Sequence, residues 1–376
     1  MNRTWVYQGL LLTAIVAVLA LIVTTTNANL ARLGVETSID FLWRRAGFEI
    51  SQSLIAFDAN STIARAFVVA LLNTLVLAIA SIAGASLLGL IVGTARLSRN
   101  WLVSRLATAY VEIFRNIPSL LQVFFWYLVV LRSLPAFRDS LSLGDAVRLN
   151  NRGLYLAWPD LGDAGPWLLA GLLLALFLVA GLARWARAHR QSTGKHFPTA
   201  LVSVALVLAV PWCLAVAAGA DMGWDIPRPG RFGYEGGLVV MPEFMALVAG
   251  LSIYNATYIS EIVRSGFAAI PRGQVEAADA LGLSRWLSFR LVLLPQALRV
   301  MIPPLTTVYL NLFKATSLAA AIAYPEIVSV FVGTVNNLVG QPVIIMGITL
   351  IIYVLVSLLI ALFMNWYNRR LALSHP

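Results

Sequence analysis

The sequence has few charged residues and almost no cysteine or histidine. Only 12% of its 376 residues are Asp, Glu, Lys or Arg, whereas a soluble domain carries about 25%. The single cysteine, Cys213, has no partner for an internal disulfide, and three scattered histidines form no Cys/His cluster for a metal. The phosphate-binding pattern G-x-x-x-x-G-K-[ST] is absent as well. We therefore predict no catalytic residue, no metal site, no cofactor in this chain, and no ATP hydrolysis by a P-loop of its own.

The sequence is rich in hydrophobic residues. They make up 60% of the sequence, and the mean hydropathy is +0.82. The formal net charge of +10 could suggest a nucleic-acid partner, but the basic residues lie in short loops between apolar runs. That distribution is typical of a polytopic protein in a lipid membrane. We expect an all-α integral membrane protein and no nucleic-acid binding.

The apolar runs predict eight transmembrane helices, because a helix needs about 20 apolar residues to cross the hydrocarbon. The first is expected to be an uncleaved span, since no convincing signal-peptide cleavage site follows it. Pro118 is expected to kink or break the third. Runs 318–324 and 327–335, separated by Pro325-Glu326, are each too short to cross and predict a re-entrant or broken element. The predicted spans are 6–23, 66–93, 110–131, 167–183, 198–218, 244–262, 291–312 and 343–363.

The loops between these spans give the expected orientation and domain organisation. Short loops rich in Arg, and Lys195, predict that the N- and C-termini are cytoplasmic. Spans four and five have almost no polar side chains, so we expect a hairpin that faces lipid. In the second span, Ala85, Gly89 and Gly93 predict close packing of another helix rather than a dimer motif. The expected parts are 1–65, 66–132, an inserted hairpin with loops in 133–240, 241–366, and a cytoplasmic tail in 367–376.

The stretch 271–296 is the longest region rich in charge and good helix formers in the C-terminal half. Pro271 to Gly273 can start a short helix over residues 275–281, Gly282 can adopt the positive φ that ends it, and Ser284 can cap the next helix. We therefore predict a helix–Gly–helix elbow outside the membrane, joined rigidly to the following span. The alternative is a surface hairpin of small residues that occurs by chance.

This elbow resembles the cytoplasmic coupling loop, or EAA loop, of ABC importer permeases. The resemblance lies in Glu276-Ala277-Ala278, then Gly282, then Leu294-Pro295. Runs 112–118, 256–266 and 314–318 resemble motifs of the polar amino-acid permeases. Over nearly the whole chain the architecture is similar to the Q-type permease subunit of general L-amino-acid transporters. The resemblance implies a five-helix type I importer core, with an added N-terminal helix and helical hairpin, in a bacterial inner membrane.

The resemblance also implies a function and partners. The chain would form the translocation path of an ATP-driven, binding-protein-dependent importer of L-amino acids. Its partners would be a second permease subunit, two ABC ATPase subunits that bind ATP and Mg, and a periplasmic amino-acid-binding protein. The alternatives are a secondary transporter and a membrane enzyme. The sequence has no inverted repeat of a broken span, which a secondary transporter would favour. It also has no group of residues typical of a catalytic site. The implied ATPase-coupling residues are Gly273, Glu276, Ala277, Ala278, Gly282 and Pro295.

Two further groups of polar residues are candidates for a gate and a substrate path. The Glu-x-x-Arg spacing occurs twice at predicted cytoplasmic helix ends, so the four side chains could close a gate by pairing across helices, or form two local interfacial ion pairs. Six polar groups could face a midplane cavity, where Lys314 could meet an amino-acid carboxylate; the alternative is hydrogen bonding between helices. The gate candidates are Glu112, Arg115, Glu261 and Arg264, and the path candidates are Tyr254, Asn255, Tyr258, Ser260, Asn311 and Lys314.

Overall fold

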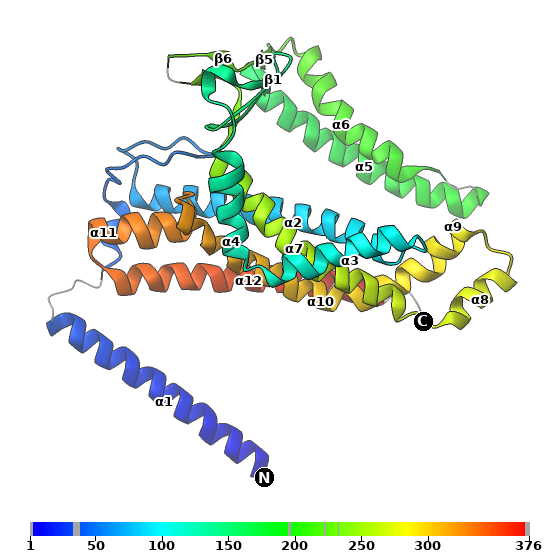
Figure 1. Cartoon of the computed structure of the whole chain (residues 1–376), viewed down its shortest axis with the longest axis horizontal. Helices are drawn as coiled ribbons and strands as arrows, with labels where there is room; N and C mark the ends of the chain where they lie inside the picture. Colours follow the sequence, from blue (N-terminus) through cyan, green and yellow to red (C-terminus); the bar gives the residue numbers. More distant parts are fainter. Residues whose placement is uncertain (1–2, 33–37, 195–196, 222, 232, 373–376) are drawn as a thin grey trace. The chain divides into compact units, whose positions relative to one another are not determined.

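The computed structural model describes residues 3–32, 38–194, 197–221, 223–231 and 233–372, which form two compact units (Figure 1). Unit 1 comprises Met1–Arg132 and Glu243–Pro376, and unit 2 comprises Ser133–Pro242. Lys195, on which part of the predicted orientation depends, and residues 373–376 of the predicted tail lie outside the described residues.

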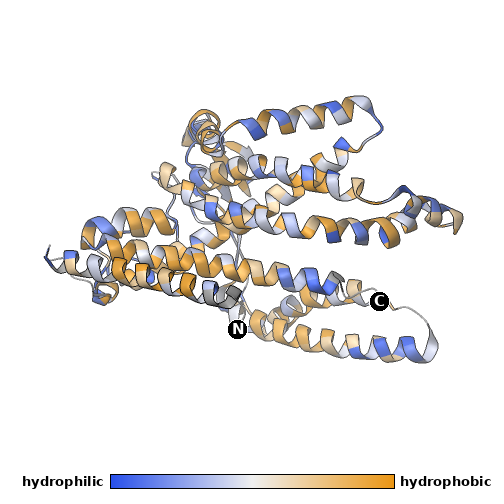
Figure 2. Cartoon of the chain, turned by 90° about the horizontal axis from the view of Figure 1, so that it is seen from below, coloured by the Kyte–Doolittle hydropathy of each residue, from blue (hydrophilic) through white to orange (hydrophobic). Residues whose placement is uncertain are grey.

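Long apolar helices dominate both units (Figures 1 and 2). Within the described ranges, seven helices are long and apolar enough to cross a membrane, or eight if one bent pair counts as a single span. This confirms the predicted class of an all-α membrane protein. The helices run a few residues beyond most of the predicted spans, because polar residues at their ends continue the helical hydrogen bonding. They include α1 (Arg3–Arg32), α2 (Ile63–Arg96), α5 (Gly165–Thr193), α6 (Thr199–Ala217), α7 (Pro242–Ala268), α10 (Leu294–Ala315) and α12 (Pro342–Ala372).

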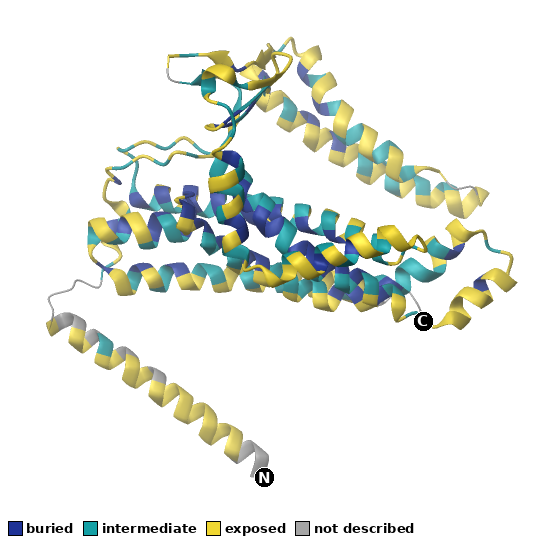
Figure 3. Cartoon of the chain, viewed as in Figure 1, coloured by how far each residue is buried: buried dark blue, intermediate teal, exposed yellow. Residues whose placement is uncertain are grey.

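Helices α2 and α7 pack against each other through the predicted small-residue stripe. A Cβ atom placed on Gly89 would lie 2.5 Å from Cβ of Ile259, and one placed on Gly93 would lie 2.7 Å from Cβ of Val263. Real Cβ atoms do not approach so closely, so the absence of side chains at these glycines lets the two backbones meet. The stripe therefore serves packing within the bundle, as predicted, and Figure 3 shows the buried residues concentrated along these helices.

The third span is broken at Pro118, as predicted, but it begins earlier in the chain than predicted. Helix α3 (Trp101–Asn116) starts ahead of the predicted 110–131 run, because the Asn100 side chain caps it by accepting from the Leu102 and Val103 amides. The direction then changes by 102° at Pro118, before α4 (Ser119–Phe124) and the π-helical η2 (Phe125–Leu131). The Gln122 side chain donates to the Phe114 and Ile117 carbonyls that the break leaves free.

A second break follows α10, at the predicted Pro325-Glu326 position. The 3₁₀ helix η6 (Thr316–Ile322) ends at Ala323, which has a φ of 58°, and the π-helical η7 (Val328–Val335) and α11 (Asn336–Val339) follow. Glu326 is fully buried and accepts from the Val328 and Ser329 amides at 2.9 and 2.7 Å. The Asn73 side chain of α2 donates to the Pro325 carbonyl. Irregular backbone inside the bundle is thus satisfied by side chains, as such breaks require.

The segment between α1 and α2 packs against other helices of unit 1 and is more than a polar loop. The short 3₁₀ helix η1 (Asp40–Trp43) buries Phe41, which joins Ile63 of α2, Phe331 of η7 and Ile345 of α12 in one apolar cluster. A β-bridge between Arg45 and Thr62 closes the segment in front of α2. The sequence expectation missed this packing, because the few apolar residues involved are spread among polar ones.

Unit 2 contains β-structure that the sequence analysis treated as polar loops. Its strands have only two to four residues, and most are partly or fully exposed, so they show no clear alternation of apolar and polar residues. A sheet of four antiparallel strands has the order β1–β2–β3–β8, and two smaller ribbons pair β4 with β5 and β6 with β7. In the apolar hairpin α5–α6, a Cβ on Gly171 would lie 2.5 Å from Cα of Pro211. The short elements are η3 (Phe137–Asp139), β1 (Leu141–Leu143), β2 (Val147–Asn150), β3 (Gly153–Leu156), β4 (Trp158–Asp160), η4 (Gly162–Ala164), β5 (Gly223–Asp225), β6 (Arg228–Pro229), β7 (Tyr234–Glu235) and β8 (Leu238–Val240).

Candidate functional site

The predicted elbow is present between α7 and α10. It consists of α8 (Arg272–Ala280), a turn at Gly282, α9 (Arg285–Ser288) and the π-helical η5 (Phe289–Leu293). The first helix begins three residues before the predicted 275, because Pro271 already occupies its N-cap and leaves no unpaired amide there. From Arg285 onward the chain is helical through α10 as far as Ile322. The elbow is therefore joined to a membrane span without an intervening loop, as predicted.

The turn of the elbow has the predicted backbone chemistry. Gly282 has a φ of +71°, a conformation that costs a residue with a side chain, and most of all a β-branched one, conformational energy. The Leu283 amide donates to the Ala278 carbonyl at 3.1 Å, and the Gly282 amide donates to the Asp279 carbonyl at 2.9 Å, which closes the end of α8. The Ser284 side chain then caps α9 by accepting from the Leu287 amide.

The exposed surface of α8 combines small residues with charged and polar ones. Gly273, Glu276 and Ala277 are exposed, whereas Ala278 is buried. Pro295 lies in the first turn of α10, and next to it Gln296 donates a hydrogen bond of 3.0 Å to Gln274 of α8. The six predicted coupling residues thus belong to one continuous structure, but only some of them can contact another protein directly. Ala278 is buried and Pro295 is half-buried, so these two residues contribute to the packing of the elbow.

Glu261, one of the gate candidates, lies in a cluster of charges at the end of α7. It pairs with Arg264 one turn later on the same helix, as the Glu-x-x-Arg spacing predicts, and with Arg96 at the end of α2 at 2.6 Å. Arg96 is the more enclosed of the two arginines, with 13% of its side chain exposed compared with 40% for Arg264. Sequence reasoning missed Arg96, because no local spacing signals a partner on another helix.

The second Glu-x-x-Arg pair is not an ion pair in the described chain. Glu112 and Arg115 are both exposed on α3, and no salt bridge joins them. Arg115 instead lies over the ring of Tyr258 on α7, 5.1 Å from its centre. The expectation of two local ion pairs is therefore correct for one pair only. Arg115 thus contacts α7 through a cation–π interaction with Tyr258 and forms a salt bridge with neither Glu112 nor Glu261.

The six path candidates do not converge on one cavity. The hydroxyl groups of Tyr254 and Tyr258 are 2.9 Å apart. Asn255 and Ser260 are buried, and their side chains donate to carbonyls of Leu251 and Thr257 in their own helix. Asn311 is exposed, and Lys314 lies at a separate cavity. Asn255 and Ser260 therefore donate within their own helix. This differs from both expectations, which were a polar site at the midplane and hydrogen bonds between helices.

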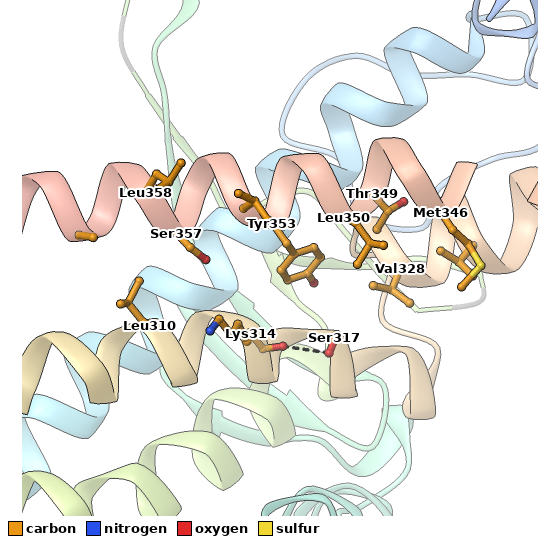
Figure 4. A pocket seen from close by; sticks show the side chains of 13 residues that line it. Leu310, Lys314, Ser317, Val328, Met346, Thr349, Leu350, Tyr353, Ser357 and Leu358 are labelled. Carbon is orange, nitrogen blue, oxygen red and sulfur yellow. Dashed lines mark hydrogen bonds between the residues drawn. The ribbon is translucent and has the colours of Figure 1, made fainter. Parts of the chain in front are cut away.

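The cavity at Lys314 lies between α10, η7 and α12 and has a volume of about 640 Å³ (Figure 4). Its lining is largely apolar, with Lys314, Ser317 and Tyr353 among the polar groups. The Ser317 hydroxyl donates to the Lys314 carbonyl, and the Tyr353 hydroxyl donates to buried Glu326 at 3.3 Å. A cavity of this size could hold a small molecule or side chains of another subunit, with one ammonium group at its edge.

Comparison with known proteins gives the family. The family described as "Binding-protein-dependent transport system inner membrane component" matches residues 197–373. AapQ, a general L-amino acid transport system permease protein of Rhizobium johnstonii, is 46% identical over 99% of this chain and 92% of its own length. YhdX, a putative amino-acid ABC transporter permease protein of Escherichia coli, is 44% identical over 99% and 94%.

A third relative is more distant but spans the same length. BztB of Rhodobacter capsulatus, a glutamate/glutamine/aspartate/asparagine transport system permease protein, is 35% identical over 99% of this chain and 94% of its own. The chain therefore belongs to the family of amino-acid ABC transporter permeases, which are inner-membrane components of binding-protein-dependent transport systems. It is an integral membrane protein of this transporter family rather than a catalytic enzyme.

Proposed function

We propose that this chain is a permease subunit of an ATP-driven importer of L-amino acids, and that its elbow couples the translocation path to separate ATPase subunits. The observation that supports coupling is the uninterrupted helix from Arg285 to Ile322. Because α8 is held against this helix by the Gln274–Gln296 hydrogen bond and the Gly282 turn, a displacement of α8 would move α10 as well.

The proposal includes the partners that such a subunit needs. A second permease subunit would complete the path, two ATPase subunits would bind ATP and Mg, and a periplasmic binding protein would deliver the amino acid. The exposed residues Gly273, Glu276 and Ala277 would contact an ATPase, since small side chains allow α8 to enter a groove deeply. The elbow and both chain termini would then lie in the cytoplasm. The 640 Å³ cavity beside Lys314 would face the second permease subunit or the substrate.

A substitution at the turn tests the coupling. In Gly282→Val, a β-branched residue is forced to a φ of +71°, which costs roughly 1–3 kcal/mol and displaces α8. We expect the reconstituted complex to assemble in the membrane but to lose the stimulation of its ATPase activity by loaded binding protein. Gly194→Val is a matched control, because Gly194 has a similar φ of +69° at the end of α5, also with no other atoms near its Cβ position. Normal stimulation in Gly282→Val would contradict the proposed coupling.

A further inference from the structure

A second cavity lies inside the elbow, separate from the one beside Lys314. It has a volume of about 410 Å³ and is lined by Gln274 of α8, by Leu291 and Val292 of η5, and by Pro295, Gln296 and Arg299 of α10. The Gln274–Gln296 hydrogen bond belongs to its wall. The coupling proposal uses this hydrogen bond but leaves the cavity and its arginine without a role.

The guanidinium group of Arg299 has donors without acceptors. Its Nε and Nη2 atoms are buried, and neither has a hydrogen-bond partner within the part of the chain that the structure describes. The three salt bridges found in the described residues involve other groups. The Arg299 side chain as a whole is half-buried, but two of its guanidinium nitrogens have neither water nor an acceptor, and buried donors without a partner are unfavourable. A bound anion at this cavity would remove that cost, and an arginine offers a fork of N–H donors that fits the oxygen atoms of a phosphate.

The surroundings of the cavity match the headgroup level of a bilayer. Leu291 lines the cavity and is 57% exposed, so a large apolar side chain lies beside the amide and guanidinium groups, and Trp286, 65% exposed, lies five residues earlier on the same helical stretch. Aromatic rings at a membrane surface prefer this level. Arg285 and Arg290 are exposed on the same short stretch but do not line the cavity. Basic pockets beside membrane helices are suited to the headgroups of anionic lipids.

We propose that Arg299 and the Gln274–Gln296 pair form a binding site for the phosphate group of an anionic phospholipid, with its acyl chains lying along the exposed apolar residues of η5 and α10. The phosphate oxygens would accept from Arg299, and a side-chain amide of the glutamine pair would supply a further donor. A lipid at this place would connect α8 to the bilayer as well as to α10. Binding of a lipid at this site does not depend on which amino acid is transported.

Native mass spectrometry of the purified complex, reconstituted first in equal amounts of phosphatidylglycerol and phosphatidylcholine, tests the proposal. We expect the wild type to retain phosphatidylglycerol preferentially, and Arg299→Gln to lose about tenfold of this preference, which corresponds to roughly 1.4 kcal/mol. Arg290→Gln is the matched control, because Arg290 is exposed on the same stretch and does not line the cavity. If Arg299→Gln does not assemble, Val292→Trp provides a second variant, since it fills the cavity and leaves the arginine in place.

The other outcomes separate the possible sources of the anion. Equal retention of phosphatidylglycerol by the wild type, Arg299→Gln and Val292→Trp overturns the proposal. Stabilisation of the lipid-free complex by inorganic phosphate, with no lipid preference, assigns the pocket to a soluble anion and overturns the lipid site. Unchanged lipid retention together with loss of the ATPase subunits from Arg299→Gln identifies an acidic side chain of a partner as the acceptor, which also overturns it. Loss of lipid preference with normal ATPase stimulation supports the lipid site alone.

Discussion

Glu261 on α7 and Arg96 on α2 form an ion pair of 2.6 Å that joins two helices far apart in the sequence. The pair lies within one helical turn of Gly93 and Val263, where the two helices are in close contact. Arg264 shares the same carboxylate but extends further into solvent. The cross-helix ion pair of Glu261 is therefore made with Arg96 and not with Arg115, which the repeated Glu-x-x-Arg spacing suggested and which instead contacts Tyr258 of α7.

We expect the Arg96–Glu261 pair to stabilise the protein more than the Glu261–Arg264 pair. An exposed i,i+3 pair contributes about 0.3–0.5 kcal/mol, whereas a more enclosed pair between helices is screened less by water. Double-mutant cycles on the free energy of unfolding, with Arg96→Gln, Arg264→Gln and Glu261→Gln, measure both couplings. We predict a coupling of roughly 1–2 kcal/mol for Arg96–Glu261. Equal couplings, or a larger one for Arg264, would show that the interhelical pair is no stronger than the local one.

The close contact of α2 with α7 predicts that Gly89→Ala destabilises the bundle. The new Cβ would lie 2.5 Å from Cβ of Ile259, so the helices must separate, and overpacking of this kind costs about 1–3 kcal/mol. Gly347→Ala on α12 is the control, because no other atom lies near its Cβ position, and it should be neutral or slightly stabilising. The melting temperature of the purified protein gives the comparison. Ile259→Gly removes the Cβ atom that the new Cβ would meet, so the double variant should lose less stability than the sum of the two single changes. Additive losses would locate the strain elsewhere.

The buried break between η6 and η7 predicts a large effect at Glu326. Glu326→Ala removes the acceptor for the Val328 and Ser329 amides, and an unsatisfied buried donor costs about 1–3 kcal/mol. Glu326→Gln keeps one carbonyl oxygen as an acceptor, so it should destabilise the protein less than Glu326→Ala. The unfolding free energies of both variants in detergent test this order. A Glu326→Ala protein as stable as Glu326→Gln would mean that water or a backbone group replaces the carboxylate.

The proposed orientation predicts opposite labelling of two introduced cysteines. In a Cys213→Ser background, Ser192→Cys near the end of α5 should react with an impermeant maleimide only after the cells are opened. The second label is placed at Ser142, which is exposed on β1. Ser142→Cys should react in intact cells. Labelling of Ser192→Cys from outside would reverse the proposed topology of the α5–α6 hairpin.

Local sequence chemistry predicted the elements that depend on neighbouring residues. The positive φ at Gly282, the cap at Ser284, the break at Pro118 and the glycine stripe at Gly89 all follow from properties of single residues or short spacings. The failures concern contacts made over long distances in the sequence. Arg96 finds Glu261 on another helix, Phe41 packs against η7, and Arg299 meets Gln274 at a cavity formed by folding.

The short strands of unit 2 could not be predicted for a related reason. Their stabilisation comes from pairing with a distant strand and not from a pattern within each strand. β3 has four residues and becomes part of a sheet only because β2 and β8 lie on its two sides. A segment of only four residues is too short to show a strand pattern when it is read alone.

The pairing of β3 with β8 also has a consequence for how the chain is made. Leu156 of β3 pairs with Leu238 of β8, while both α5 and α6 lie between them in the sequence. During synthesis β3 emerges first. Its edge for β8 stays unpaired until both helices have been inserted and β8 has reached the same side of the membrane. The sheet can therefore be completed only after both α5 and α6 have been inserted. A chain that inserts only one of the two helices leaves the strands on opposite sides and exposes an unpaired edge, which can pair with another chain.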